Sequence, residues 1–443
     1  DRRPPLPSLT TMKSKNSGIK LLVIGSGGRE HAMAWRLAQS PGVQKVYVAP
    51  GNAGTARERR LTNVNLTDPV VLACFAKREG IRLTVVGPEA PLAAGVVDVF
   101  RARGLKIFGP TREAAQLESS KDFAKRFMAR HNIPTAGFGT FSESTAAHAY
   151  IDRQGAPIVI KADGLAAGKG VVVAMSLAEA HAAIDDMLSG NKLGDAGARV
   201  VIEEFLDGEE ASFIVMVDGR NVLALAASQD HKRIGDGDTG PNTGGMGAYS
   251  PAPCVTPEVH AKAMREIIQP TVRGMAADGI PFTGFLYAGL MIGKDGSVKT
   301  LEFNCRMGDP ETQPILMRLK SNFIELLEHG IAGTLDQVEA EWDRRVALGV
   351  VLAAANYPDT PRNGDVISGL PKGNGFGEDV HVFHAGTAER DGQVVTAGGR
   401  VLCVTALGEN AKLAQRRAYE AAAEISWDGM QFRTDIGHRA VGR

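Results

Sequence analysis

From Ile19 onward, short apolar runs alternate with segments of helical periodicity. Four runs end in small or turn-forming residues: "KLLVIGSGG", "KVYVAPGNAG", "LTVVGPEAP" and "KIFGP". Continuous apolar runs of this kind are typical of parallel strands that are buried on both faces and connected by helices. The pattern therefore predicts an open parallel α/β sheet over residues 19–118. Because ligands bind outside the carboxyl ends of such strands, loops 25–28, 51–54 and 87–91 should line one cleft.

The pattern changes after Pro110. A helix is expected over 119–131, and the segment "PIVIKADGLAAGKGVVVAM" then predicts an antiparallel hairpin, because β-branched runs flank a glycine-rich turn. A second hairpin joins "GFLYAGLMI" to "VKTLEFN". We place an α+β region at 119–340, with a small subdomain at about 137–206.

The segment 341–443 predicts a small C-terminal α+β domain. The run Val346 to Ala355 should be a buried strand, further strands are expected near "DVISGL", "DVHVFHAG" and "GGRVLCVTAL", and a helix is expected near Asn410 to Ile425. Residues 1–18 mix proline and basic residues without an apolar core, so we expect a tag or leader outside the fold. The predicted class is a multidomain α/β and α+β protein.

Composition narrows the possible partners. The 50 basic and 50 acidic residues balance, which disfavours a nucleic-acid or anionic membrane surface. No apolar run approaches the roughly 18 residues of a membrane span. The 4 cysteines lie far apart, which disfavours a zinc site or a disulfide framework and fits a reducing cytoplasm.

The loop "KADGLAAGKG" is built to hold an anion. Gly164, Gly168 and Gly170 expose backbone N–H groups, while Lys161 and Lys169 supply positive charge for phosphate oxygens. The Walker A spacing is not met. The alternative is an ordinary glycine hairpin with solvated lysines.

The strand "TLEFN" predicts a metal site. Alternation places Glu302 and Asn304 on one face and apolar side chains on the other. Oxygen ligands suit magnesium, whose remaining positions nucleotide phosphates can fill. The following "CRMGDPETQP" brings Arg306 and Asp309 close to this face. The alternative is a surface turn of salt-bridged charges.

Three further segments suggest ligand contacts. "GSGGREH" opens a helix and forms an anion site, but Glu30 replaces the third glycine of a dinucleotide fingerprint, so a sugar phosphate fits better than a nicotinamide cofactor. Residues 228–251 are too polar and too long for a simple connecting loop within a compact domain, so they suggest a lid or a binding loop. "VVIEEFLDGEEAS" could offer a strand edge to adenine and Glu210 to a ribose. Helix capping, a disordered linker and solvated carboxylates are the respective alternatives.

The ordered motifs "GSGGREHA", "APGNAGTA", "VGPEAPL", "KADGLAAGKGV", "IEEFLDGEEAS", "NTGGMGAYSP" and "EFNCRMGDPETQ" resemble the phosphoribosylamine–glycine ligase family of ATP-grasp enzymes. The resemblance implies ATP-dependent joining of glycine to 5-phosphoribosylamine through glycyl phosphate, in de novo purine biosynthesis. It implies ATP and Mg²⁺ or Mn²⁺ as cofactors, glycine and phosphoribosylamine as substrates, no nucleic-acid or membrane partner, and a cytoplasmic monomer. The sequence also departs from the family at Met307, where a phenylalanine is expected.

The same resemblance implies roles for individual residues. The metal ligands would be Glu302 and Asn304. Three residues would be catalytic: Arg306, Lys169 and Asp230. The ATP site would comprise Lys121, Lys161, Gly168, Lys169, Gly170, Glu203, Glu204, Phe205, Leu206 and Glu210. The substrates would contact Gly27, Gly28, Arg29, Glu30, Gly51, Asn52, Ala53, Gly54, Pro88, Glu89, Thr243, Gly244, Gly245, Met246 and Asp309.

Two other function classes fit the sequence less well. An NAD-dependent oxidoreductase on the N-terminal sheet requires a complete glycine fingerprint and a ribose-binding acid, which the sequence lacks. A regulatory nucleotide-binding protein without turnover would tolerate loss of Glu302, Asn304 and Arg306, yet all three are present. Because the chain ends after this one unit, no fused second activity is expected.

Overall fold

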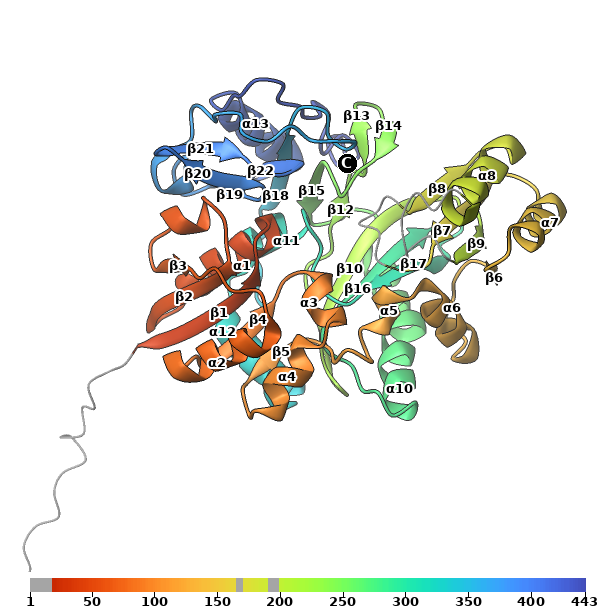
Figure 1. Cartoon of the computed structure of the whole chain (residues 1–443), viewed down its shortest axis with the longest axis horizontal. Coiled ribbons are helices and arrows are strands. Elements are labelled where there is room, and N and C mark those ends of the chain that lie inside the picture. Colours follow the sequence, from red (N-terminus) through yellow and green to blue (C-terminus); the bar gives the residue numbers. More distant parts are fainter. Residues whose placement is uncertain (1–17, 165–169, 190–198) are drawn as a thin grey trace, which may run out of the picture.

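The computed structural model describes residues 18–164, 170–189 and 199–443 (Figure 1). Its N-terminal part is the predicted parallel sheet, with strand order β3-β2-β1-β4-β5. The strands are β1 (Ile19–Gly25), β2 (Val43–Pro50), β3 (Leu61–Asn63), β4 (Leu83–Val86) and β5 (Ile107–Phe108). The strand order reverses at β1 and β4, which brings loops 25–28 and 87–91 together as the sequence pattern predicted.

Two helix layers cover this sheet. One face packs against α2 (Pro69–Glu79) and α4 (Val96–Ala102). The other packs against α1 (Gly28–Ala38) and against α12 (Phe323–Ala332), which comes from about 300 positions later in the chain. The approach of α12 is close, because a Cβ on Gly330 would lie 2.5 Å from the Phe108 ring. The N-terminal core is therefore completed by a distant segment.

Two antiparallel sheets follow and confirm both predicted hairpins. The small sheet has the order β6-β9-β7-β8 and the larger one β11-β10-β16-β17. Their strands are β6 (Phe138–Phe141), β7 (Ile158–Ala162), β8 (Val171–Ala174), β9 (Val200–Glu204), β10 (Glu209–Asp218), β11 (Val222–Ala224), β16 (Thr283–Ile292) and β17 (Val298–Asn304). The flanking helices are α3 (Glu89–Ala93), α5 (Gln116–Ser119), α6 (Lys121–Arg130), α7 (Ser144–Gln154), α8 (Leu177–Ile184), α9 (Pro257–Ala263) and α10 (Gln269–Ala277).

The C-terminal sheet lies above the parallel sheet in Figure 1 and has the order β12-β15-β18-β22-β19. Two of its strands come from the segment that sequence alone predicted to be a loop, 228–251, which also forms a small β-ribbon, β13–β14. The elements are β12 (Gln229–Asp230), β13 (Arg233–Gly235), β14 (Thr239–Asn242), β15 (Gly247–Ser250), α11 (Thr312–Arg318), β18 (Val346–Ala353), β19 (Val380–His384), β20 (Thr387–Arg390), β21 (Gln393–Thr396), β22 (Arg400–Gly408) and α13 (Ala411–Ala422).

One predicted strand of this region is wrong. "DVISGL" makes only isolated bridges, Val366 with Val395 and Ser368 with Ser426, because it contacts β21 first and then turns to the segment at Ser426. In the described ranges, no helix has both the length and the apolar character needed to cross a membrane.

Candidate active site

Lys161 links the small sheet to the strand that carries Glu302. Its Nζ lies 3.1 Å from the carbonyl oxygen of Leu301 and 2.6 Å from a carboxylate oxygen of Glu203. The pairing of β16 with β17 shifts register at Leu301, which interrupts the strict alternation predicted for this strand. Glu302 and Asn304 are nevertheless partly exposed while Phe303 is buried, so the two oxygen donors stay outside the core.

Lys121 fixes the start of the glycine-rich loop. It begins α6, donates from Nζ to the carbonyl oxygen of Gly164 at 2.7 Å, and donates its backbone N–H to Asp163 Oδ1 at 2.6 Å. Gly170 closes the loop, since its carbonyl oxygen accepts from the Ala162 N–H at 2.7 Å. Gly168 and Lys169 lie outside the described residues.

The Glu203 carboxylate does not point toward an open strand edge. It is 3% exposed and lies between the ammonium groups of Lys125 and Lys161. Its strand, β9, is paired on both sides as far as Glu204, so the predicted edge for adenine begins only at Phe205 and Leu206. Glu203 therefore orients Lys161, a role that the sequence did not suggest.

Glu302 lies in a strongly positive environment. Burial disfavours its charge, but Lys232, Lys161, Lys121 and Arg306 outweigh this effect and lower its pKa. The carboxylate is therefore ionised and available to a cation.

Lys232, which no sequence motif indicated, belongs to the same cluster of charges around Glu302. Its Nζ lies 3.6 Å from Glu210, and this carboxylate is the main cause of its raised pKa. Lys232 lies two positions after Asp230, just beyond the end of β12. Because side chains alternate along an extended chain, the order "QDHK" could have indicated that Asp230 and Lys232 lie on the same side. Burial raises the pKa of Asp230 to about 7, an effect that Lys232 opposes and that Glu311 reinforces.

Arg306 is held by carboxylates from two short helices. Its Nη2 lies 2.9 Å from Glu118 of α5, and its Nε lies 3.3 Å from Glu89 of α3. Although burial opposes its charge, these carboxylates raise its pKa, so the guanidinium remains cationic. Glu89 thus contacts Arg306 and is not among the residues that line the adjoining cavity.

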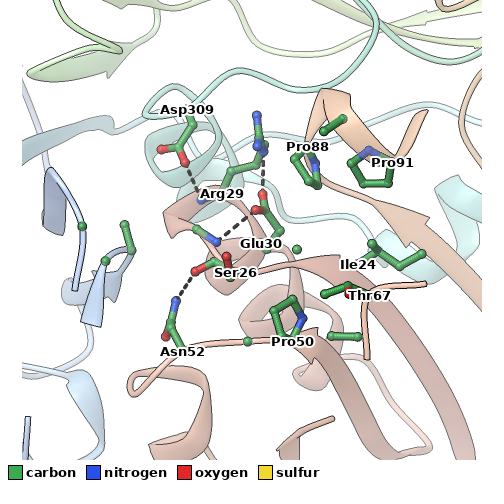
Figure 2. A pocket seen from close by; sticks show the side chains of 18 of the residues that line it. Ile24, Ser26, Arg29, Glu30, Pro50, Asn52, Thr67, Pro88, Pro91 and Asp309 are labelled. Atoms are coloured by element: carbon green, nitrogen blue, oxygen red, sulfur yellow. Dashed lines mark hydrogen bonds and ion pairs between the residues drawn. The ribbon is translucent and has the colours of Figure 1, made fainter. Parts of the chain in front are cut away.

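That cavity, of about 930 Å³, lies at the carboxyl ends of the parallel strands (Figure 2). The predicted convergence of the three N-terminal loops is confirmed, since Gly27, Gly51 and Pro88 line the same space. A further wall was not predicted. It comes from the C-terminal sheet and consists of Ala385, Gly386, Thr387, Ala397, Gly398 and Arg400.

The amino end of α1 is occupied by the protein's own carboxylates. Gly27 N–H donates to Glu30 at 3.0 Å and Arg29 N–H donates to Asp309 at 3.2 Å. Figure 2 shows Glu30 and Asp309 on either side of Arg29. Gly25 and Gly87 make room for Glu30, because a Cβ on either would lie within 2.4 Å of its side chain. The glycines therefore accommodate a carboxylate, and the predicted anion site at these two amides must be revised.

Asn52 ties the second loop to its neighbours. Its Nδ2 donates to the carbonyl oxygens of Ser26 and His384, each at 2.8 Å, and its Oδ1 accepts from the Gly54 N–H at 2.8 Å. Ala53 is buried, and Gly54 packs against the His384 ring. Gly28 similarly packs against Gln313. Of the loop at 51–54, only Gly51 and Asn52 line the cavity.

The amides of residues 243–246 are all used within the fold. Their acceptors are the carbonyl oxygen of Lys232 for Thr243, the Tyr357 hydroxyl for Gly244, the Thr243 hydroxyl for Gly245 and the carbonyl oxygen of His231 for Met246. The prediction that these amides act as free ligand donors is therefore not supported. Gly244 instead makes room for Arg400, since a Cβ at this position would lie 2.9 Å from the Arg400 Cζ.

Among the described residues, His31, Glu58 and His381 form a group with metal-ligand composition. Glu58 Oε1 lies 3.0 Å from His31 Nε2 and 2.5 Å from His381 Nε2. The backbone N–H of His384 donates to His31 Nδ1 at 2.7 Å, so the proton of the neutral His31 ring resides on Nε2. That nitrogen donates to Glu58 and has no lone pair for a metal. The group is a hydrogen-bonded link between α1 and β19.

Comparison with known proteins decides the family. Models of the phosphoribosylglycinamide synthetase N domain, ATP-grasp (A) domain and C domain match residues 19–118, 119–312 and 347–439. The chain belongs to the phosphoribosylglycinamide synthetase family.

Relatives of this family are similar over nearly the whole chain. A phosphoribosylamine–glycine ligase of Ralstonia nicotianae is 69% identical over 425 residues, which cover 96% of this chain and 100% of the relative. The crystal structure of phosphoribosylamine–glycine ligase from Thermotoga maritima has a TM-score of 0.83 and 38% identity, covering 94% and 100% of the two chains. A biotin carboxylase domain from Hydrogenobacter thermophilus shares the fold, with a TM-score of 0.70, 15% identity and coverage of 94% and 92%.

Proposed function

We propose that this chain is a phosphoribosylamine–glycine ligase, which joins glycine to 5-phosphoribosylamine and converts ATP to ADP and phosphate. The family supports the reaction. The observation that carries it to this structure is the meeting of Lys161 from the small sheet with the backbone beside Glu302, at 3.1 Å from Leu301. A triphosphate placed there would have cationic side chains on one side and a carboxylate suited to a divalent ion on the other.

The reaction proceeds in two steps. One oxygen of the glycine carboxylate attacks the γ-phosphorus of ATP, the bond to the β–γ bridging oxygen breaks, and ADP leaves. The amine nitrogen of phosphoribosylamine then attacks the carbonyl carbon of glycyl phosphate. The acyl–oxygen bond breaks, phosphate leaves with one glycine oxygen, and the amine loses a proton. Phosphoryl transfer of this kind depends mainly on positioning and charge neutralisation.

The charged side chains divide these tasks. Lys121, Lys161 and Lys232 would neutralise the phosphates, and Arg306 would stabilise negative charge on the acyl phosphate and the tetrahedral intermediate. Glu302 and Asn304 fit Mg²⁺ or Mn²⁺, because both offer oxygen atoms outside the core, and the ion would neutralise the β- and γ-phosphates.

The remaining assignments follow the positions of the side chains. Adenine would bind where the backbone leaves β9 at Phe205 and Leu206, and Glu210 would reach the ribose. Asp230 would bind the ammonium group of glycine. The cavity at the parallel sheet would hold phosphoribosylamine. We further propose a cytoplasmic monomer with domains at 19–118, 119–340 and 341–443.

Omission of each substrate tests the reaction. ADP release is measured with Mg²⁺, ATP, glycine and freshly prepared phosphoribosylamine, and each component is left out in turn. Coupled ligation requires both glycine and the amine for sustained ADP release. An equal rate without the amine would show an uncoupled ATPase.

A further inference from the structure

Of the charged side chains around the cavity, some already have partners within the protein and others can still bind a ligand. Four charged residues line it: Arg29, Glu30, Asp309 and Arg400. The Arg29 guanidinium already has partners within the protein. Its Nε lies 2.5 Å from Glu30, and its Nη1 donates to the carbonyl oxygen of Met307 at 3.2 Å. Glu30 and Asp309 carry negative charge beside the amino end of α1. A phosphate dianion placed there would meet like charges in a partly desolvated space.

Arg400 is the second cation that lines the cavity, and its charge offsets that of the Asp309 carboxylate. Its Nη1 donates to the carbonyl oxygens of Asp309 at 2.6 Å and Gly244 at 2.9 Å, which fixes the guanidinium plane. Within the part of the chain that the structure describes, Nε and Nη2 of Arg400 have no hydrogen-bond acceptor. A guanidinium held by one nitrogen and free at the other two is suited to a two-point contact with phosphate.

Two glycines near Arg400 in sequence, Gly386 and Gly398, expose their backbone to the cavity. A Cβ on Gly386 would lie 2.6 Å from the Cα of Gly398, so both positions lack side chains and their backbones line the cavity. Gly386 N–H donates to the carbonyl oxygen of Arg400 at 2.9 Å. Over the described residues, the N–H of Gly398 has no such acceptor. Gly398 and Arg400 line the same wall of the cavity, and a free amide and a free guanidinium edge are both groups that bind phosphate oxygens.

We propose that Arg400 and the Gly398 amide form the binding site for the phosphate group of the phosphoribosyl substrate. The proposal deepens the proposed function and rests on it. It moves the phosphate from the amino end of α1, where the sequence had placed it, to the C-terminal wall of the cavity. The wall would then select phosphorylated over unphosphorylated sugar amines.

A comparison of two substrates, with and without the phosphate group, tests the role of Arg400. Wild type and Arg400→Gln are compared with phosphoribosylamine and with ribosylamine, which lacks the phosphate, by kcat/KM at saturating ATP and glycine. The variant should lose about 10- to 100-fold with phosphoribosylamine and less than about 3-fold with ribosylamine, because the charge-assisted contact exists only with the first substrate. Arg390→Gln, an exposed arginine on β20, is the matched control and should leave both values unchanged.

The outcomes separate three cases. An equal loss of kcat/KM with both sugars would overturn the site, because it would show that Arg400 only holds the backbone carbonyls of 244–245 and 309. An unchanged kcat/KM with both sugars would also overturn it. Absence of turnover in wild type would instead refute the ligase itself. If Arg400→Gln does not fold, competition by ribose 5-phosphate is measured in wild type and Arg400→Lys, where the inhibition constant should rise at least about 5-fold. An unchanged constant would overturn the site.

Discussion

The Nζ of Lys161 lies 3.1 Å from the carbonyl oxygen of Leu301, across 140 positions of sequence. This contact brings the glycine-hairpin strand β7 against β17 at the residue before Glu302. Cationic side chains and the oxygen donors of β17 therefore face one space, which the transfer of a phosphoryl group requires.

Replacing Glu302 by glutamine should stop turnover without unfolding the protein. The carboxylate is ionised among four cations, and its loss would remove one of the two proposed ligands for a divalent ion. We expect kcat to fall at least about 100-fold while the free energy of unfolding changes by about 1 kcal/mol or less. ADP release and urea denaturation measure the two effects. Glu325→Gln, on the exposed side of α12, is the control, and near-normal turnover in Glu302→Gln would remove the metal assignment.

Glu203→Gln should act through Lys161. Burial lowers the pKa of Lys161, but the carboxylates of Glu203 and Glu302 together outweigh this effect and keep it charged. Without this carboxylate the ammonium should deprotonate at lower pH, so kcat/KM for ATP should decline earlier on the alkaline side and fall about 10-fold at neutral pH. A purely structural role would lower the rate without moving the alkaline limb. Lys299→Met, at a partly exposed lysine on β17, should change neither.

Glycine binding should depend on pH through Asp230. The pKa of this carboxyl is raised to about 7, mainly by burial, so it is neutral in weak acid and ionised above neutrality. Since the ammonium group of glycine stays charged over this range, the KM for glycine should fall as pH rises from 6 to 8, by about 5- to 10-fold, and then level off. Asp230→Asn should give a high KM that is independent of pH. A wild-type KM that is constant over this interval would exclude Asp230 as the ammonium ligand.

Local patterns were sufficient to predict much of the fold and part of the site. Alternation and turn residues predicted the β7–β8 and β16–β17 hairpins, and the strand ends predicted the convergence of the N-terminal loops. What failed depends on contacts between distant segments. Strand β15 of the segment 228–251 forms because β18 provides a partner, and the Arg29 amide of the predicted anion site is occupied because Asp309 arrives from 280 positions away.

Arg400 illustrates the same limit. In sequence it is one arginine at the start of an apolar strand, and nothing nearby indicates a ligand. Its place in the cavity follows from the packing of the C-terminal sheet above the parallel sheet, and the glycines that receive it lie 155 and 156 positions earlier. Side chains of this kind require the tertiary structure to be recognised.

Glu58→Gln should weaken the link between α1 and β19. Burial opposes the charge of Glu58, but hydrogen bonds from His31 and His381 lower its pKa well below the ordinary value of 4.5. A carboxyl whose pKa is lowered on folding stabilises the fold at any pH above its pKa in the unfolded state. It loses this contribution as the pH falls toward its pKa in the folded state. We expect a loss of about 2 kcal/mol at pH 7 that shrinks below about pH 4.5.

Thermal or urea denaturation at both pH values measures this change. Glu389→Gln, which removes an exposed ion pair with Arg57, should alter stability by less than about 0.5 kcal/mol. A chelator should leave the wild-type melting temperature unchanged, since His31 Nε2 carries a proton and offers no lone pair to a metal. A loss for Glu58→Gln that persists in acid would contradict the pKa argument.

Isotope transfer from glycine tests the central claim, that the carboxylate is activated by phosphoryl transfer before the amine attacks. Glycine labelled with ¹⁸O in its carboxylate is turned over with ATP and phosphoribosylamine, and the released phosphate is analysed by mass spectrometry. Each phosphate should carry one ¹⁸O, and Glu302→Gln should produce almost none. Unlabelled phosphate formed together with the amide product would contradict the account.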